Sequence, residues 1–251
     1  MKLSFEPNNE EVAKNGFVRA PEKPSPEHSS KHSSKQPRKH YVKIYTFGEE
    51  VGNSISHGAM ALFALIALPF VTIKAYSEVG WLQAICISVF MISIFLMFLS
   101  STLYHSMAQE SKHKAVFRIL DHIFIYVAIA GTYTPVALCV IKGWQGWVIF
   151  GIQWGMVLAG ILYKSLVSMS LPKLSVAIYI VMGWTAVMFL PSWLANSSPA
   201  HLFLILAGGV FYTSGVIFYS MKKKYAHMVW HFFINMGAAC HFVAIIFFLN
   251  K

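Results

Sequence analysis

The sequence predicts an all-α membrane protein with seven transmembrane helices, the N-terminus in the cytoplasm and the C-terminus outside. Three observations predict it: 56% of the residues are hydrophobic and only 12% are charged, the apolar residues form seven long stretches, and Lys and Arg are distributed unevenly. Such a composition is too apolar for a water-soluble domain. The alternating strands of about ten residues that build a membrane barrel are absent, so the spans are expected to be helices.

The seven stretches set the predicted helices. They cover approximately residues 52–75, 80–106, 117–140, 144–166, 174–191, 200–221 and 226–249. A helix needs about 20 apolar residues to cross the bilayer core, and six of the stretches meet that length comfortably. The fifth is marginal. The linkers are short, so neighbouring helices are expected to pack antiparallel.

Residues 1–46 differ in composition and are predicted to be a disordered, basic cytoplasmic tail before a membrane domain of residues 47–251. The tail is rich in Ser, Lys, Pro, Glu and His, and it holds 9 of the 20 Lys and Arg residues. A segment of this kind cannot bury enough apolar surface to fold. Its histidines, His28, His32 and His40, are expected to be solvated.

Charge in the linkers sets the predicted orientation. With the N-terminus inside, 17 of the 20 Lys and Arg residues lie on the cytoplasmic side, and only Lys74, Lys142 and Lys251 lie outside. The positive-inside rule favours this orientation and a multi-pass protein of the cell inner (plasma) membrane. The net charge of +10 does not indicate nucleic-acid binding, because the basic residues flank apolar spans. Membrane lipids are the expected partners.

The three cysteines, Cys86, Cys139 and Cys240, are scattered through apolar stretches without a CxxC motif. Their odd number argues against a disulfide framework, and they are expected to be small core or lipid-facing residues.

Titratable residues gather at one predicted membrane face. Asp121 is the only aspartate in the chain and opens the third span. Four histidines at span ends lie at the same predicted level: His57, His105, His227 and His231. Ionisable groups at membrane depth are costly and indicate a functional site.

The spacing of these residues indicates a metal. Ser101 and His105 are four residues apart and share a helix face, as do His227 and His231. Two imidazoles at this spacing can bind one ion, although the Glu of HExxH is absent. His105 would add a third nitrogen and leave a fourth position for water, as in catalytic zinc sites. Asp121 would contact that water or ligate directly, and Ser101 would donate to an oxyanion.

The same residues suit a proton relay, which stays open as a competing use. Taken singly, His57, His122 and His241 are expected to form interhelical hydrogen bonds. His241 lies ten residues beyond His231, or about 15 Å deeper, too far to share the ion. His113 and His201 are expected in loops or at the membrane interface.

The start of the first span leaves two roles open. Glu49, Glu50, Asn53 and His57 could contact the metal site or cap the first helix. Capping is favoured, because carboxylates suit a helix N-terminus.

These motifs carry a family resemblance. The runs are GEEVGNSISHG (48–58), FLSSTLYH (98–105), LDHIFIYVAIAGTYTP (120–135), MGW (182–184), GVIFY (215–219) and HMVWHFFINMGAACHF (227–242). Over residues 41–249 the chain resembles bacterial hemolysin III proteins, of the superfamily of progestin and adipoQ receptors that includes the adiponectin receptors. The resemblance implies a zinc site near the cytoplasmic face. It places the SxxxH motif at Ser101 and His105, the carboxylate at Asp121 and the HxxxH pair at His227 and His231. In the receptor branch three His hold zinc and the Asp acts through a water.

Three functions follow from this. The first is a zinc-dependent hydrolase of lipid amides or esters, as in the related alkaline ceramidases, acting in membrane lipid homeostasis. The second is a non-catalytic membrane sensor or regulator with structural zinc. The third is a cytolytic pore-former, which ranks last because secreted pore-formers need a soluble state.

Overall fold

The computed structural model describes residues 17–19, 41–43, 45–166 and 172–249. The chain forms two units, Met1–Gly48 and Glu49–Lys251. In the first, strands β1 (Phe17–Arg19) and β2 (Tyr41–Lys43) pair antiparallel. The remainder of the predicted disordered tail, apart from residues 45 and 46, lies outside the described residues. The prediction of disorder therefore stays a prediction.

Helices account for nearly all of the described residues from Phe47 onward. They are α2 (Phe47–Glu78), α3 (Trp81–Ser106), α4 (Lys112–Pro135) with the π-helix η1 (Val136–Ile141), α5 (Gly143–Leu166), α6 (Pro172–Gly183), the 3₁₀ helix η2 (Thr185–Phe189), α7 (Leu190–Asn196), α8 (Pro199–Ser220) and α9 (Ala226–Phe248). Seven helical segments of the described chain are long and apolar enough to cross a membrane, and they correspond to the seven predicted stretches.

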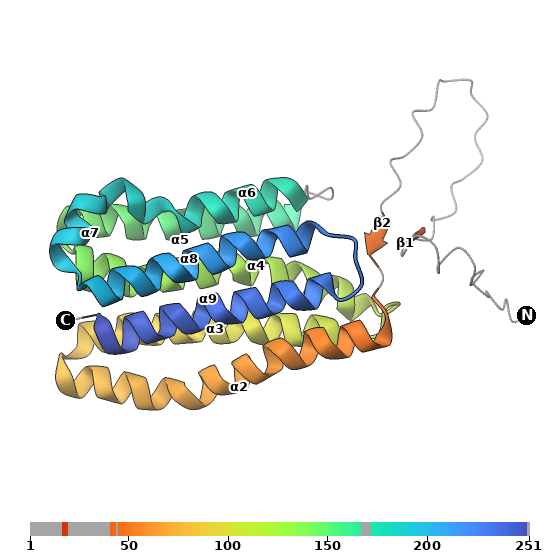
Figure 1. Cartoon of the computed structure of the whole chain (residues 1–251), viewed down its shortest axis with the longest axis horizontal. Helices are drawn as coiled ribbons and strands as arrows, with labels where there is room; N and C mark the ends of the chain where they lie inside the picture. Colours follow the sequence, from red (N-terminus) through yellow and green to blue (C-terminus); the bar gives the residue numbers. More distant parts are fainter. Residues whose placement is uncertain (1–16, 20–40, 44, 167–171, 250–251) are drawn as a thin grey trace, which may run out of the picture. The chain divides into compact units, whose positions relative to one another are not determined.

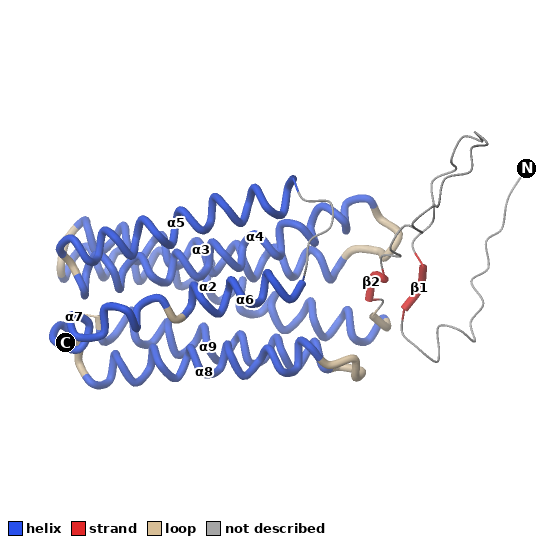
Figure 2. Tube along the Cα trace, turned by 90° about the horizontal axis from the view of Figure 1, so that it is seen from above, coloured by secondary structure: helices blue, strands red, loops and turns tan. Residues whose placement is uncertain are grey.

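The long helices lie side by side with their axes roughly aligned, and consecutive spans run in opposite directions (Figures 1 and 2). The most extensive pairings join α3 to α4 and α8 to α9. Short connections, such as the two residues between α2 and α3, enforce this antiparallel order. The ends of α3, α5 and α8 therefore lie at the same end of the bundle as the starts of α2, α4, α6 and α9.

Two spans depart from a regular helix, and proline accounts for both. The marginal fifth stretch extends over Lys173–Asn196 but is broken into α6, η2 and α7. Pro191 has no N–H for the helix ladder and lies in the first turn of α7, where that N–H is not needed. Pro135 ends the regular part of the third span, and the chain continues as η1 up to Lys142, whose φ of 59° terminates the helix.

The bundle core is built from large side chains and close helix contacts. Phe90, Met91 and Phe98 of α3 are fully buried in a cluster that also includes residues of α2 and α9. Gly131 permits α4 to approach α3, because a Cβ there would overlap the Ser93 hydroxyl. Of the cysteines, Cys86 and Cys139 are buried free thiols and Cys240 is half-buried and free, as small core residues would be.

Candidate metal centre

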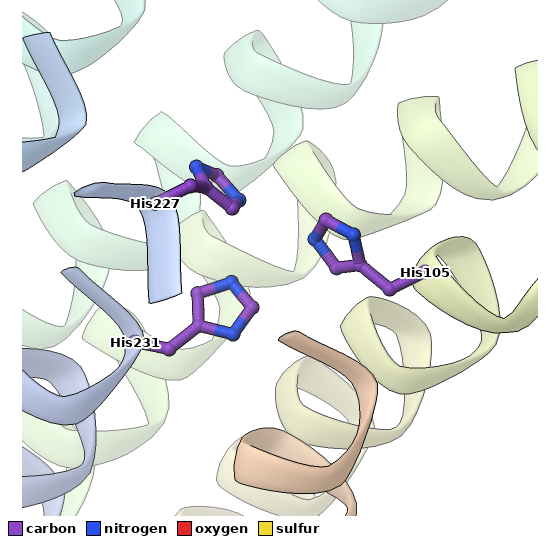
Figure 3. A group of neighbouring side chains, drawn as sticks. All are labelled: His105, His227 and His231. Atoms are coloured by element: carbon purple, nitrogen blue, oxygen red, sulfur yellow. The ribbon is translucent and has the colours of Figure 1, made fainter. Parts of the chain in front are cut away.

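Three histidines from two helices meet at one end of the bundle (Figure 3). His105 comes from the last turn of α3, and His227 and His231 come from the first two turns of α9. All three are buried, and one potential ligand atom from each lies within 4.8 Å of the other two. The structure thus confirms that the SxxxH and HxxxH motifs converge at one level. Among the residues that the structure describes, no other His, Cys, Asp or Glu joins this group.

Hydrogen bonds from α2 fix the tautomer of His231. Its Nδ1 lies 3.1 Å from the Asn53 carbonyl oxygen and 3.0 Å from the Ser56 hydroxyl. A carbonyl oxygen only accepts, so Nδ1 carries the proton and donates it. The lone pair is then on Nε2, which is buried and has no hydrogen-bond partner among the described residues. A ring held through one nitrogen with the other free is the arrangement of a metal ligand.

His105 is held in the same way by a carboxylate. Its Nδ1 lies 2.5 Å from Glu50 Oε2, and a carboxylate at that distance accepts the Nδ1 proton. The amide nitrogen of Asn53 lies 3.5 Å from the same Nδ1. If Nδ1 carries a proton, both of these nitrogens are donors and cannot bond to each other, so the tautomer is assigned from the shorter contact with Glu50. Nε2 is left as the coordinating nitrogen of His105.

Glu49 and Glu50 are therefore not confined to capping α2. Glu49 Oε1 accepts from the backbone N–H of Tyr225, at the turn before α9, with a distance of 3.0 Å. Glu50 reaches His105, and Asn53 and Ser56 reach His231. The favoured capping interpretation is wrong for Glu50, because the first turn of α2 lies beside the last turn of α3, where histidine and lysine donors compete for the carboxylate. The long-range pairing of α2 with α3 could not be read from local sequence.

The predicted catalytic residues lie near this level but outside the three-histidine group. Ser101 is buried one turn before His105 on α3. Asp121 is half-buried in α4, and its carboxylate lies 3.8 Å from Nδ1 of His122. The His122 ring nitrogen is 2.6 Å from the Arg118 carbonyl of its own helix, so the prediction of an interhelical hydrogen bond is wrong for this ring. The catalytic roles of Ser101 and Asp121 stay predictions.

The remaining described histidines are not members of this group, although His57 lies directly against it. The predicted interhelical hydrogen bond is wrong for His57, because neither of its ring nitrogens has a hydrogen-bond partner among the described residues. His57 stacks on His231 with ring centroids 3.6 Å apart and an interplanar angle of 6°. His241 Nε2 lies 3.1 Å from the Ile205 carbonyl, an interhelical bond as predicted. A loop position is wrong for His201, which is fully buried in the first turn of α8 with Nδ1 3.3 Å from the Ala244 carbonyl, while its position at the membrane interface stays a prediction. The α8–α9 pairing encloses its ring. The tail histidines lie outside the described residues.

Comparison with known proteins agrees with this architecture. The family profile described as "Haemolysin-III related" matches residues 45–242. The chain is 37% identical over 209 residues to the "Hemolysin-3 homolog" of Bacillus subtilis (strain 168), covering 83% of this chain and 98% of the relative. It is 35% identical over 202 residues to "Hemolysin-3" of Bacillus cereus, covering 80% and 92%. The human "Monocyte to macrophage differentiation factor" is 24% identical over 207 residues, covering 78% and 83%, which fits the wider superfamily. The chain therefore belongs to the haemolysin-III related family of membrane proteins.

Proposed function

We propose that this protein binds one zinc ion through His105, His227 and His231 and acts on membrane lipids as a zinc-dependent amide or ester hydrolase. The observation that carries the proposal is the convergence of three buried imidazoles whose ligand atoms lie within 4.8 Å. The donor set fits zinc, which takes three histidines in open sites. The unpartnered Nε2 of His231, with its Nδ1 proton already donated to a carbonyl, supports this fit.

Zinc bound there would supply a Lewis acid that polarises a carbonyl and acidifies a coordinated water. Asp121 would hold that water by a hydrogen bond and accept its proton, as a half-buried carboxylate at the same bundle end can. The buried Ser101 hydroxyl, one turn from His105, would donate to the oxygen of the substrate carbonyl as negative charge develops on it. Neighbouring side chains would exclude bulk water.

The proposal includes an inner (plasma) membrane location with the N-terminus in the cytoplasm. Since 17 of the 20 Lys and Arg residues then lie inside, the histidine group lies near the headgroups of the cytoplasmic leaflet. Membrane lipids whose acyl amide or ester bonds lie at the level of the headgroup interface would be the substrates. A role in membrane lipid homeostasis follows from that substrate class.

Asp121→Asn tests the catalytic part. The substitution keeps the shape of the side chain and removes its ability to accept a proton, so we expect hydrolysis of lipid amides and esters to be lost with zinc content unchanged. Glu110→Gln, an exposed carboxylate on the same side of the bundle, is the matched control and is expected to keep full turnover. Retained turnover in Asp121→Asn would overturn the assignment of Asp121.

A second candidate function is a non-catalytic regulator in which zinc is structural. The hydrogen bonds around the site favour it, because they connect α2 to His105 on α3 and to His231 on α9. A bound ion would then fix three helices relative to one another. No product would form, and removal of zinc would act on stability alone.

A further inference from the structure

The first two turns of α2 line the histidine group without contributing any of its three histidines. We propose that Glu50 is a positioning residue of the metal centre, which orients His105 and strengthens its Nε2 as a ligand. This inference rests on the proposed zinc site and assigns the outer shell of that site to α2. Glu50 is placed to do this by its contacts, which join three separate parts of the chain.

The Glu50 carboxylate accepts from three donors. Oε2 lies 2.5 Å from His105 Nδ1, and Oε1 lies 2.6 Å from Gln109 Nε2 and 2.7 Å from Lys114 Nζ. Only 12% of the Glu50 side chain is exposed, so water cannot replace these partners freely. Three donors with one cation among them require an ionised carboxylate. A largely buried anion therefore lies directly behind His105.

A carboxylate behind a histidine affects the far nitrogen of the ring. By accepting the Nδ1 proton, Glu50 holds the imidazole in the tautomer with the lone pair on Nε2 and fixes the ring plane. Its negative charge increases the electron density that Nε2 can share with a cation. Residues in this position typically contribute 10–100-fold to metal affinity.

Lys114 balances this charge and complicates the test. Its ammonium group is buried, donates to the Met107 carbonyl at 2.9 Å and lies 5.0 Å from the Tyr104 ring centre. Loss of the Glu50 charge alone would leave Lys114 as an uncompensated buried cation, which costs stability whether or not metal is bound. Removing both charges together separates positioning from stability.

The same helix orients a second histidine. Asn53, three residues after Glu50, presents its carbonyl to His231, and the Ser56 hydroxyl donates to that carbonyl at 2.9 Å while accepting from His231. One face of α2 thus fixes a histidine of α3 by a side chain and a histidine of α9 mainly by its backbone. Of these two contacts, only the one made by the Glu50 side chain can be altered by a conservative substitution, because the other is made by the backbone carbonyl of Asn53.

The experiment measures zinc affinity of the full-length protein in detergent against a competing fluorescent chelator, together with the melting temperature of the metal-free protein. Glu50→Gln is expected to weaken zinc binding 10–100-fold and to lower the melting temperature. In the double variant Glu50→Gln with Lys114→Met, the melting temperature should return toward that of the wild type while zinc affinity stays low. Glu78→Gln, an exposed carboxylate 3.4 Å from Lys74 at the other end of α2, should leave both unchanged.

Wild-type zinc affinity in the double variant would overturn the positioning role, because the effect of Glu50→Gln would then be one of stability. An equal loss of affinity in Glu78→Gln would also overturn it, since the effect would not be local. Failure of the wild-type protein to bind zinc would instead overturn the proposed function, and this inference with it.

Discussion

Gly208→Ala should separate the structural histidine of α9 from the metal-binding pair. A Cβ at position 208 of α8 would overlap the Cδ2 and Nε2 atoms of His241 and lie 3.0 Å from the Gly237 carbonyl. The carbonyl belongs to the α9 backbone and cannot move away. The imidazole of His241 must therefore shift and give up its hydrogen bond to the Ile205 carbonyl.

The expected cost follows from three contributions. Overpacking of a tight contact costs about 1–3 kcal/mol, and a buried polar group left without its partner costs about 1–3 kcal/mol. Alanine gains about 1 kcal/mol over glycine in a helix interior. The free energy of unfolding should therefore fall by about 1–5 kcal/mol. Zinc affinity should not change, because His241 lies ten residues and about 15 Å from His231.

Denaturant titration of the purified protein in detergent measures the loss. Gly209→Ala is the matched control, because its Cβ would meet only the Trp184 ring, with Cζ2 and Cη2 at ordinary distances of 3.6 and 3.8 Å. In a His241→Ala background, Gly208→Ala should cost less, since the clashing ring is gone and only the contact with the Gly237 carbonyl at 3.0 Å remains. Equal stability of Gly208→Ala and Gly209→Ala, or an unchanged cost without the His241 ring, would refute the reasoning.

Two further predictions concern the metal and the membrane. Chelation of the metal should lower the free energy of unfolding, and zinc added back at 100 times its Kd should restore about 2.7 kcal/mol. Mg²⁺ should not restore it, because Mg²⁺ prefers oxygen ligands. An unfolding curve that responds to neither chelation nor zinc would contradict a tightly bound ion. For orientation, a membrane-impermeant maleimide should label Lys142→Cys in intact cells and Lys223→Cys only after permeabilisation, in a background without the three native cysteines. The reverse pattern would show that the N-terminus lies outside.

Periodicity and loop charge predicted much of this protein. The apolar stretches located all seven spans, because a bilayer-sized run of apolar residues is a local property of the chain. Four-residue spacing and loop charge placed His105 and the α9 pair at one level. The marginal length of the fifth stretch was predicted, but its break into α6, η2 and α7 was not, although Pro191 was a signal for that break.

Contacts between spans could not be predicted in this way. The choice between capping and site contact for Glu50 depended on how α2 is rotated against α3, and that rotation is set by packing of residues distant in sequence. The same holds for the burial of His201, which depends on where α8 meets α9. The polar atoms of α2 carried a signal in hindsight: a Glu, an Asn and a His at positions 50, 53 and 57 share one helix face.

The most direct test of the central claim is the metal content of the purified protein, measured by elemental analysis beside the double variant His227→Ala with His231→Ala. We predict about one zinc per chain in the wild type and none in the variant, since a single histidine cannot hold the ion. A folded wild-type protein without metal, or a double variant that keeps its zinc, would contradict the three-histidine site. The first result would favour a hydrogen-bonded histidine network, and the second would place the ion elsewhere.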